Sequence, residues 1–147
     1  MDGRTSRESR LCEAGAGDAS RVIALWRRCG LTRPWNDPEQ DFRRAVEAPA
    51  SAILLLEAPE VLAAAVMVGF DGHRGWVYYL AVDPEQRRQG IGRQMMAAAE
   101  DWLRVCGAPK IQLMVREDNA DAIGFYEALG LERQEVVTLG RFLKDDA

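Results

Sequence analysis

The sequence is poor in the features that mark secreted, membrane-spanning and metal-binding chains. No apolar run is long enough to cross a membrane, and the polar segment 1–10 lacks the apolar stretch of a signal peptide. The three cysteines have no metal-ligand spacing, and two of them, Cys29 and Cys106, belong to apolar helical patterns. We therefore predict buried, reduced thiols, no bound metal and a cytoplasmic location, with residues 1–9 as a flexible tail.

An excess of positive charge is also lacking. The chain has 19 lysine and arginine residues against 23 aspartate and glutamate residues, which gives a formal net charge of −4. This balance argues against broad nucleic-acid binding and weakly favours a cationic partner, although a solvated acidic surface explains the same value. With 147 residues, 48% of them hydrophobic, the chain can form one substantial core but not two. We predict a single domain over residues 10–147.

Two common nucleotide-binding motifs are missing as well. Gly92 is followed by Arg93 and Gln94, where a P-loop requires lysine and then serine or threonine. After Gly90-Ile91-Gly92 the chain has Met95 where the dinucleotide fingerprint requires a third small residue. This glycine pair also comes late in the chain and not after a first strand, so neither motif fits.

The chain does contain a predicted strand joined to a predicted helix by a loop rich in arginine and glycine. Residues 76–82 are apolar on both alternating faces, as in a strand covered on both sides, so we expect this strand to lie centrally in a sheet. A spacing of three to four predicts a helix that ends at Gly107, with apolar positions at Ile91, Met95, Ala98, Ala99, Trp102 and Cys106.

The loop between this strand and this helix suits an anion. A helix N-terminus offers unpaired N–H groups and a partial positive charge, and Gly90 and Gly92 allow close approach to the backbone. Arg87 and Arg88 can add charge-assisted hydrogen bonds to a phosphate or pyrophosphate. A plain glycine turn that caps a surface helix, with exposed arginines, explains the loop equally well.

Local patterns place the remaining elements. Asp18 can cap a helix that ends at Gly30, and Asp37 can cap another that begins with Pro38. A further helix is predicted over residues 121–129. Strands are predicted over residues 10–13, 51–57, 61–70, 110–115 and 134–142, with the second and third paired as a hairpin. This order of strands and helices indicates an α/β fold with a mixed sheet.

Two motifs together resemble those of a known family. The pattern Val82-x-Pro84-x-x-Arg87-x-x-Gly90-x-Gly92, followed by a helix, resembles the coenzyme A pyrophosphate loop of the GNAT superfamily of N-acetyltransferases. Further along, Asn119, Phe125-Tyr126-Glu127 and Gly130-Leu131 are similar to the superfamily's next motif in order and spacing. The resemblance covers residues 10–143. Two segments, residues 33–38 and 69–75, resemble those of small bacterial acetyltransferases of the YpeA type.

The resemblance implies a GNAT-like single domain and a cofactor site. The fold would be a mixed, mostly antiparallel sheet of about six to seven strands flanked by about four helices. A backbone N–H near Leu80 would polarise the thioester carbonyl of acetyl-coenzyme A (acetyl-CoA). The residues assigned to acetyl-CoA are Leu80, Ala81, Val82, Arg87, Arg88, Gln89, Gly90, Ile91, Gly92, Arg93 and Asn119.

The resemblance also places the Tyr126 hydroxyl beside the departing coenzyme A sulfur. A tyrosine has a reference pKa of about 10 and a thiol one of about 8.5, so full proton transfer is uphill by roughly 2 kcal/mol and can amount to a strong hydrogen bond. Packing of an aromatic ring against the sheet is the other interpretation, and Phe125 suits it better because it has no hydroxyl. We predict that Tyr126 is catalytic.

The base and the acceptor are less defined. Many relatives carry a glutamate on the strand that corresponds to residues 76–82, whereas this segment has no carboxylate. His73, Asp71 or a carboxylate acting through a water held by Tyr78 or Tyr79 are open alternatives for the base. The missing strand carboxylate weakly favours an acceptor amine of low basicity.

The acceptor would lie against residues on three segments, which are Trp35, Asn36, Asp71, His73 and Tyr78. Structural roles are open for Trp35 as a core plug and for His73 in a turn. The predicted function is N-acetylation of a primary amine by direct attack in a ternary complex, with a homodimer possible through edge strands. A non-catalytic acyl-CoA-binding or regulatory module and a pure interaction domain are the alternatives.

Overall fold

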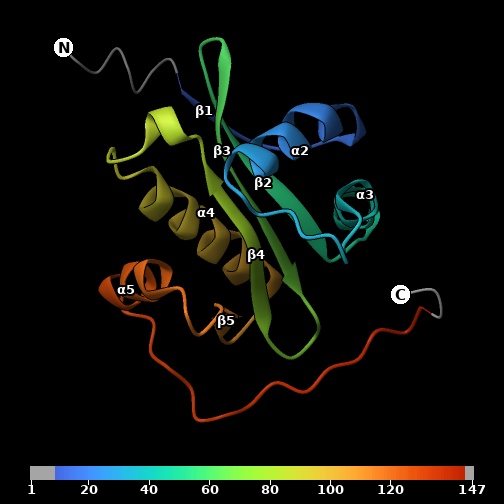
Figure 1. Ribbon diagram of the computed structural model, residues 1–147, viewed down its shortest axis with the longest axis vertical. Coiled ribbons are helices and arrows are strands. Elements are labelled where there is room, and N and C mark those ends of the chain that lie inside the picture. Colours follow the sequence, from blue (N-terminus) through green and yellow to red (C-terminus); the bar gives the residue numbers. More distant parts are fainter. Residues whose placement is uncertain (1–8, 145–147) are drawn as a thin grey trace. The chain divides into compact units, whose positions relative to one another are not determined.

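The computed structural model describes residues 9–144, an α/β structure built around a mixed sheet (Figure 1). Most of the predicted tail, residues 1–8, lies outside the described part of the chain. The described residues form two compact units, one ending at Met114 and one beginning at Val115. No helix among residues 9–144 has both the length and the apolar character needed to cross a membrane.

The first unit contains the sheet and most of the helices. The strands are β1 (Arg10–Glu13), β2 (Ser51–Ala58), β3 (Val61–Phe70), β4 (Gly75–Val82) and β5 (Ile111–Leu113), and they lie in that order across the sheet. The helices are η1 (Ala16–Asp18), α2 (Ala19–Arg28), α3 (Pro38–Glu47), η2 (Pro84–Gln86) and α4 (Ile91–Cys106), and the second unit adds α5 (Ala120–Ala128). β1 to β4 pair antiparallel and β5 pairs parallel with β4, so the predicted mixed, mostly antiparallel sheet is confirmed.

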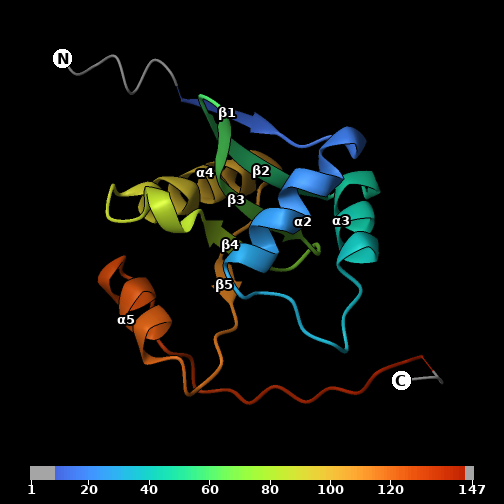
Figure 2. The ribbon, with the colours of Figure 1, turned by 45° about the horizontal axis from the view of Figure 1, so that its top comes forward.

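Two apolar layers cover the two faces of this sheet. Helices α2 and α3 lie on one face, where Trp26 and Phe42 pack with Ile53 and Leu55 of β2 (Figure 2). Helix α4 lies on the other face and contributes buried Met95 among others. Strands β2 and β3 are buried on both faces of the sheet. Since alternate residues of a strand point to opposite faces, their sequences are apolar almost continuously.

The predicted helix boundaries are confirmed within one or two residues, and the local capping explains two of them. At the start of α3 the Asp37 carboxylate accepts hydrogen bonds from the N–H groups of Glu39 (3.1 Å) and Gln40 (3.3 Å). Asp18 stands at the predicted N-cap position of α2, but its carboxylate instead accepts from the Gly15 N–H at 2.8 Å and from Arg21. Asp18 therefore occupies the predicted N-cap position, but its side chain stabilises the preceding turn and not the start of α2.

Strand β4 differs from its prediction in position and in burial. It is second from the edge of the described sheet and not central, because β3 lies in the middle. It is also not covered along both faces, since Tyr78 is 43% exposed. The apolar pattern of residues 76–82 predicts a strand but not the irregularity of its backbone.

That irregularity is a β-bulge. Ala65 of β3 pairs with Ala81 and Met67 pairs with Tyr78, so one extra residue is inserted on the β4 side between these pairs. Tyr79 takes up the insertion with φ of 54°, in the left-handed region that bulky residues rarely adopt. Since paired residues share a face, Tyr78 lies on the face of Met67, and Tyr79 stacks on Trp26 of α2 over that same face. The bulge therefore turns two consecutive tyrosines to one side of the sheet.

The number of strands is smaller than predicted. The described residues form five strands, not six to seven, and the strand predicted over 110–115 is limited to Ile111–Leu113. The strand predicted over 134–142 is wrong, because that segment runs without helix or strand (Figure 1). Its apolar side chains stay exposed, as at Val137 (85%) and Leu139 (90%). Alternation and strand propensity do not make a strand when no neighbouring strand completes the ladder.

The prediction of buried thiols is partly wrong. Cys106, the last residue of α4, is exposed although it follows the apolar spacing of that helix. Cys12 and Cys29 are partly buried, and the Cys29 thiol donates a hydrogen bond to the Val82 carbonyl oxygen at 3.2 Å. All three are free cysteines.

Candidate functional site

The loop between β4 and α4 makes a tight turn through two left-handed residues. Arg88 has φ of 67°, and Gly90, the N-cap of α4, has φ of 76°. A side chain at Gly90 would meet no atom within 4 Å, so the backbone conformation and not the lack of space favours glycine there. The first N–H groups of α4 have no partner within the helix, and exposed Arg87 and Arg88 precede them. The loop thus has the donors and charge that an anion requires.

A buried carboxylate fixes the start of this loop. Asp83 is only 6% exposed and accepts hydrogen bonds from the Arg28 guanidinium and the Glu85 N–H, both at 2.9 Å. Its own N–H donates to the Ala63 carbonyl oxygen at 2.8 Å. Arg28 thereby ties the end of α2 to the end of β4. The motif leaves position 83 unspecified, although an aspartate before Pro84 is a typical helix-cap signal.

Among the described residues, no strand pairs with the end of β4 on the side of β5. The parallel ladder joins Gly75, Trp76 and Val77 to β5 and stops there. Ala81 and Val82 still pair with β3, and Leu80 lies within the bulge. Residues 80–82, which the resemblance assigns to acetyl-CoA, therefore lie beyond the β4–β5 ladder.

A cavity of about 580 Å³ lies over the bulge on the face covered by α2 and α3. It is lined by Leu31, Asn36, Asp41, Arg44, Ala45, Ser51, Met67, Val68, Gly69, Tyr78 and Tyr79. Of the predicted acceptor residues, Asn36 and Tyr78 line this cavity. Trp35, Asp71 and His73 are not among its lining residues, and Trp35 is 51% exposed.

Asp71 has a structural task in the turn between β3 and β4. Its carboxylate accepts hydrogen bonds from the N–H groups of Arg74 (2.7 Å) and His73 (2.8 Å) and from the Trp76 indole at 3.0 Å. The Arg74 and His73 donors hold the pKa of Asp71 below its ordinary value. A carboxylate held in this way is a weaker base, which favours the interpretation of residues 71–75 as a stabilised turn.

Asp41 and Arg44 are charged cavity residues that were not predicted from the sequence. The Tyr79 hydroxyl donates to Asp41 Oδ2 at 2.8 Å, and the Arg44 guanidinium lies 3.2 Å from Asp41 Oδ1. Burial raises the pKa of Tyr79, and the Asp41 carboxylate raises it further, so the tyrosine stays protonated and acts as a donor. No short-range pattern links Asp41 to Tyr79, which is 38 residues away. The local sequence predicts only an ion pair between Asp41 and Arg44, which are three positions apart and share a face of α3.

The second unit contains the remaining predicted residues. Asn119 caps α5, its side chain accepting from the Ala122 N–H at 3.1 Å. Tyr126 contacts Phe125 edge-to-face, with ring centroids 5.0 Å apart. Burial raises the pKa of Tyr126. The difference between this pKa and that of a thiol therefore increases, which favours a hydrogen bond over full proton transfer.

Comparisons with known proteins agree with this architecture. The model of the Acetyltransferase (GNAT) family matches residues 20–131. Acetyltransferase ECA0875 of Pectobacterium atrosepticum is 46% identical over 129 residues, which cover 88% of this chain and 92% of that protein.

Two solved structures share the fold. AAC(6')-Iy in complex with the bisubstrate analog CoA-S-monomethyl-acetylneamine has a TM-score of 0.78 at 17% identity, covering 91% of this chain and 97% of that one. The ribosomal-protein-S18-alanine N-acetyltransferase of Escherichia coli has a TM-score of 0.72 at 26% identity, covering 83% and 76%.

Proposed function

Because the chain belongs to the GNAT family of acetyltransferases, we propose that it transfers an acetyl group from acetyl-CoA to the nitrogen of a primary amine. The observation that carries this proposal is the arrangement around β4. The loop that contains left-handed Gly90 directly follows β4. Residues 80–82 of β4 lie beyond the β4–β5 ladder, and the cavity lies over Tyr78 and Tyr79 of the same strand. One strand thus borders both a suitable cofactor path and a space for an acceptor.

Each part of this arrangement fits one part of acetyl-CoA. Arg87 and Arg88, with the N–H groups at the start of α4, would bind the pyrophosphate. The further loop residues assigned to acetyl-CoA are Gln89, Gly90, Ile91, Gly92 and Arg93. Asn119 is likewise assigned to acetyl-CoA. Backbone groups of Leu80, Ala81 and Val82 would bind the pantetheine arm and stabilise the oxyanion that forms on the thioester carbonyl.

In the proposed reaction the amine attacks directly while both substrates are bound. The nitrogen forms a bond to the acetyl carbon and loses a proton, and the carbon–sulfur bond breaks. Tyr126 would donate a hydrogen bond to the departing thiolate, which takes up a proton from it or from water. Trp35, Asp71 and His73 remain proposed acceptor contacts, and a homodimer and a cytoplasmic location remain predictions from the sequence.

The test is release of coenzyme A thiol from acetyl-CoA with a panel of free amino acids, peptides, polyamines and aminoglycosides. Calorimetry of acetyl-CoA binding runs in parallel. Amine-dependent release supports the proposal, whereas binding without release for every amine supports the alternative of an acyl-CoA-binding module. Absence of both binding and release contradicts the coenzyme A site itself.

A further inference from the structure

The cavity over the β4 bulge has one negative and one positive side chain. Among the described residues that line it, Asp41 is the carboxylate and Arg44 the guanidinium, and both come from one face of α3. Arg44 is 68% exposed, and the two groups form an ion pair at 3.2 Å. Exposed pairs of this spacing contribute little to stability, so a charged ligand can replace either partner at low cost.

The negative side chain is held in place before any ligand arrives. The Tyr79 hydroxyl donates to Asp41 Oδ2, and the Tyr79 ring stacks on Trp26 with centroids 3.9 Å apart and planes 13° from parallel. Trp26 is fully buried, so this tyrosine cannot shift easily. Asp41 Oδ1, which faces Arg44, is the oxygen that can accept hydrogen bonds from a ligand ammonium.

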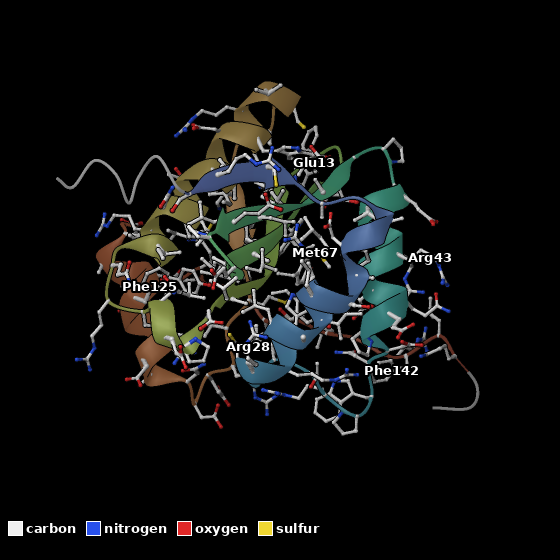
Figure 3. The ribbon with its side chains drawn as sticks, turned by 90° about the horizontal axis from the view of Figure 1, so that it is seen from above. Glu13, Arg28, Arg43, Met67, Phe125 and Phe142 are labelled. Carbon is white, nitrogen blue, oxygen red and sulfur yellow. The ribbon has the colours of Figure 1, made fainter. Side chains whose placement is uncertain are left out.

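The positive side chain is suited to a carboxylate. A guanidinium offers two parallel N–H donors that match the two oxygens of a carboxylate. Its neighbour Arg43 does not line the cavity; it extends from α3 away from the sheet and hydrogen-bonds with Gln40 (Figure 3). Arg44 is therefore the guanidinium of α3 that can reach a bound molecule.

The rest of the cavity is mainly apolar. Met67 lies on the sheet face that α2 and α3 cover (Figure 3), and Leu31 and Ala45 add further apolar surface. A volume of about 580 Å³ is in the range of sites for small molecules. A polycation would meet a single carboxylate and an adjacent guanidinium that repels additional ammonium groups.

We propose that this cavity binds an acceptor that carries both an ammonium group and a carboxylate on an apolar body, as an α-amino acid with an apolar side chain does. The ammonium group binds Asp41, the carboxylate binds Arg44, and the side chain packs against Met67 and Ala45. This inference rests on the proposed transferase function, for which it names the acceptor. The bound ammonium group first loses one proton to solvent, and the neutral nitrogen then attacks the thioester carbonyl. As the carbon–sulfur bond breaks, the nitrogen loses a second proton and the thiolate takes one up, which yields an N-acetyl amino acid, coenzyme A thiol and one released proton.

The experiment compares L-leucine, L-methionine and L-phenylalanine with their amides and with the amines that lack the carboxylate. The readout is kcat/KM for coenzyme A thiol release at saturating acetyl-CoA. Because an acid and its amide differ in amine pKa, the acid-to-amide ratio is compared between variants. We expect Arg44→Gln to lower this ratio at least tenfold, while the matched Arg43→Gln variant leaves it unchanged. Asp41→Asn should weaken every acceptor, and Glu39→Gln, an exposed carboxylate of the same helix, should not.

A direct binding measurement distinguishes failure of the amino acid inference from failure of the proposed transferase function. L-Leucine is titrated calorimetrically into the protein saturated with coenzyme A, and heat of binding that is lost in Arg44→Gln supports the inference. No binding of any of the three amino acids, or an acid-to-amide ratio that Arg44→Gln does not change, overturns the inference. If other amines are acetylated in that case, the proposed function stands; if acetyl-CoA itself does not bind, the proposed function fails.

Discussion

Strands β3 and β4 lie side by side in the sheet but differ in backbone conformation and in burial. Residues 62–66 of β3 are buried on both faces, whereas β4 contains a bulge, a left-handed tyrosine and the 43% exposed Tyr78. The hairpin of β2 and β3, whose register shifts once near its turn, between Leu56 and Glu57, carries the two apolar layers. Strand β4 carries Tyr78 and Tyr79, which line the cavity. Stability is thus assigned mainly to β2 and β3 and binding to β4, and substitutions can test each assignment.

The largest expected effect is on the stability of the hairpin. Leu55 of β2 has no exposed surface, so Leu55→Ala should lower the free energy of unfolding by about 2–5 kcal/mol through lost burial and a cavity. Leu139→Ala, at a leucine that is 90% exposed, should change it by less than about 0.5 kcal/mol. Urea denaturation measures both, and similar losses at the two sites would contradict the burial assigned to them.

The next effect concerns the loop after β4. Arg87→Ala should remove a charged hydrogen bond worth about 1.5–3 kcal/mol, and so weaken acetyl-CoA binding by about 10- to 100-fold without changing stability. Arg104→Ala is the control, because Arg104 is an exposed arginine at the other end of α4. Calorimetry measures both variants. An unchanged affinity in Arg87→Ala would remove this arginine from the pyrophosphate site.

A smaller effect is expected on the leaving group. Tyr126→Phe removes the hydroxyl proposed to stabilise the thiolate, so kcat should fall by about tenfold, or about 1.4 kcal/mol in the barrier. Affinity for acetyl-CoA should change by less than about twofold, since the hydroxyl acts on the departing sulfur. Steady-state kinetics with the best acceptor and calorimetry separate the two quantities. Unchanged turnover would exclude Tyr126 from the reaction.

The two consecutive tyrosines of β4 offer a comparison within the strand itself. Tyr79→Phe keeps the ring on Trp26 but removes the hydrogen bond to Asp41, so the free energy of unfolding should fall by about 0.5–1.5 kcal/mol. Tyr78→Phe, at the more exposed tyrosine, should have less effect on stability. Equal effects of the two substitutions in urea denaturation would show that the Asp41 bond does not hold α3 to β4.

The smallest effect lies at the far edge of the sheet and depends on pH. Hydrogen bonds from Arg21 and Arg10 lower the pKa of Glu57 to about 2. A lowered carboxyl pKa stabilises the folded protein at pH values above the unfolded pKa, and the contribution is lost as the pH falls through about 2. Glu57→Gln should therefore cost at most about 1 kcal/mol at pH 7, and the difference should shrink below about pH 4.5. A constant difference down to pH 2 would contradict this ion pair.

The regular parts of the fold were predictable because short-range patterns determine them. The spacing of Ile91, Met95 and Ala99, with Gly107 after it, predicts the observed α4. The hairpin of β2 and β3 follows from two apolar runs joined by a short turn. The loop residues Arg87 and Gly90 were also identified from their spacing, and the structure adds the left-handed backbone that suits an anion.

The irregular parts were not predictable, because they depend on contacts between distant residues. The sequence Tyr78-Tyr79 reads as an ordinary strand, and only pairing with Ala65 and Met67 reveals the inserted residue. Asp41 reads as a surface position of an amphipathic helix until Tyr79 is placed beside it. The apolar segment 134–142 fails for the same reason, since a strand requires a partner that its own sequence does not specify.

The most direct test of the account is amine-dependent release of coenzyme A thiol from acetyl-CoA by the wild-type protein, measured beside Arg87→Ala and Arg44→Gln. The account predicts release with apolar α-amino acids, weaker acetyl-CoA binding in the first variant and a lower acid-to-amide ratio in the second. Release that neither substitution alters would contradict the assignment of the loop to the cofactor and of the bulged strand's cavity to the acceptor.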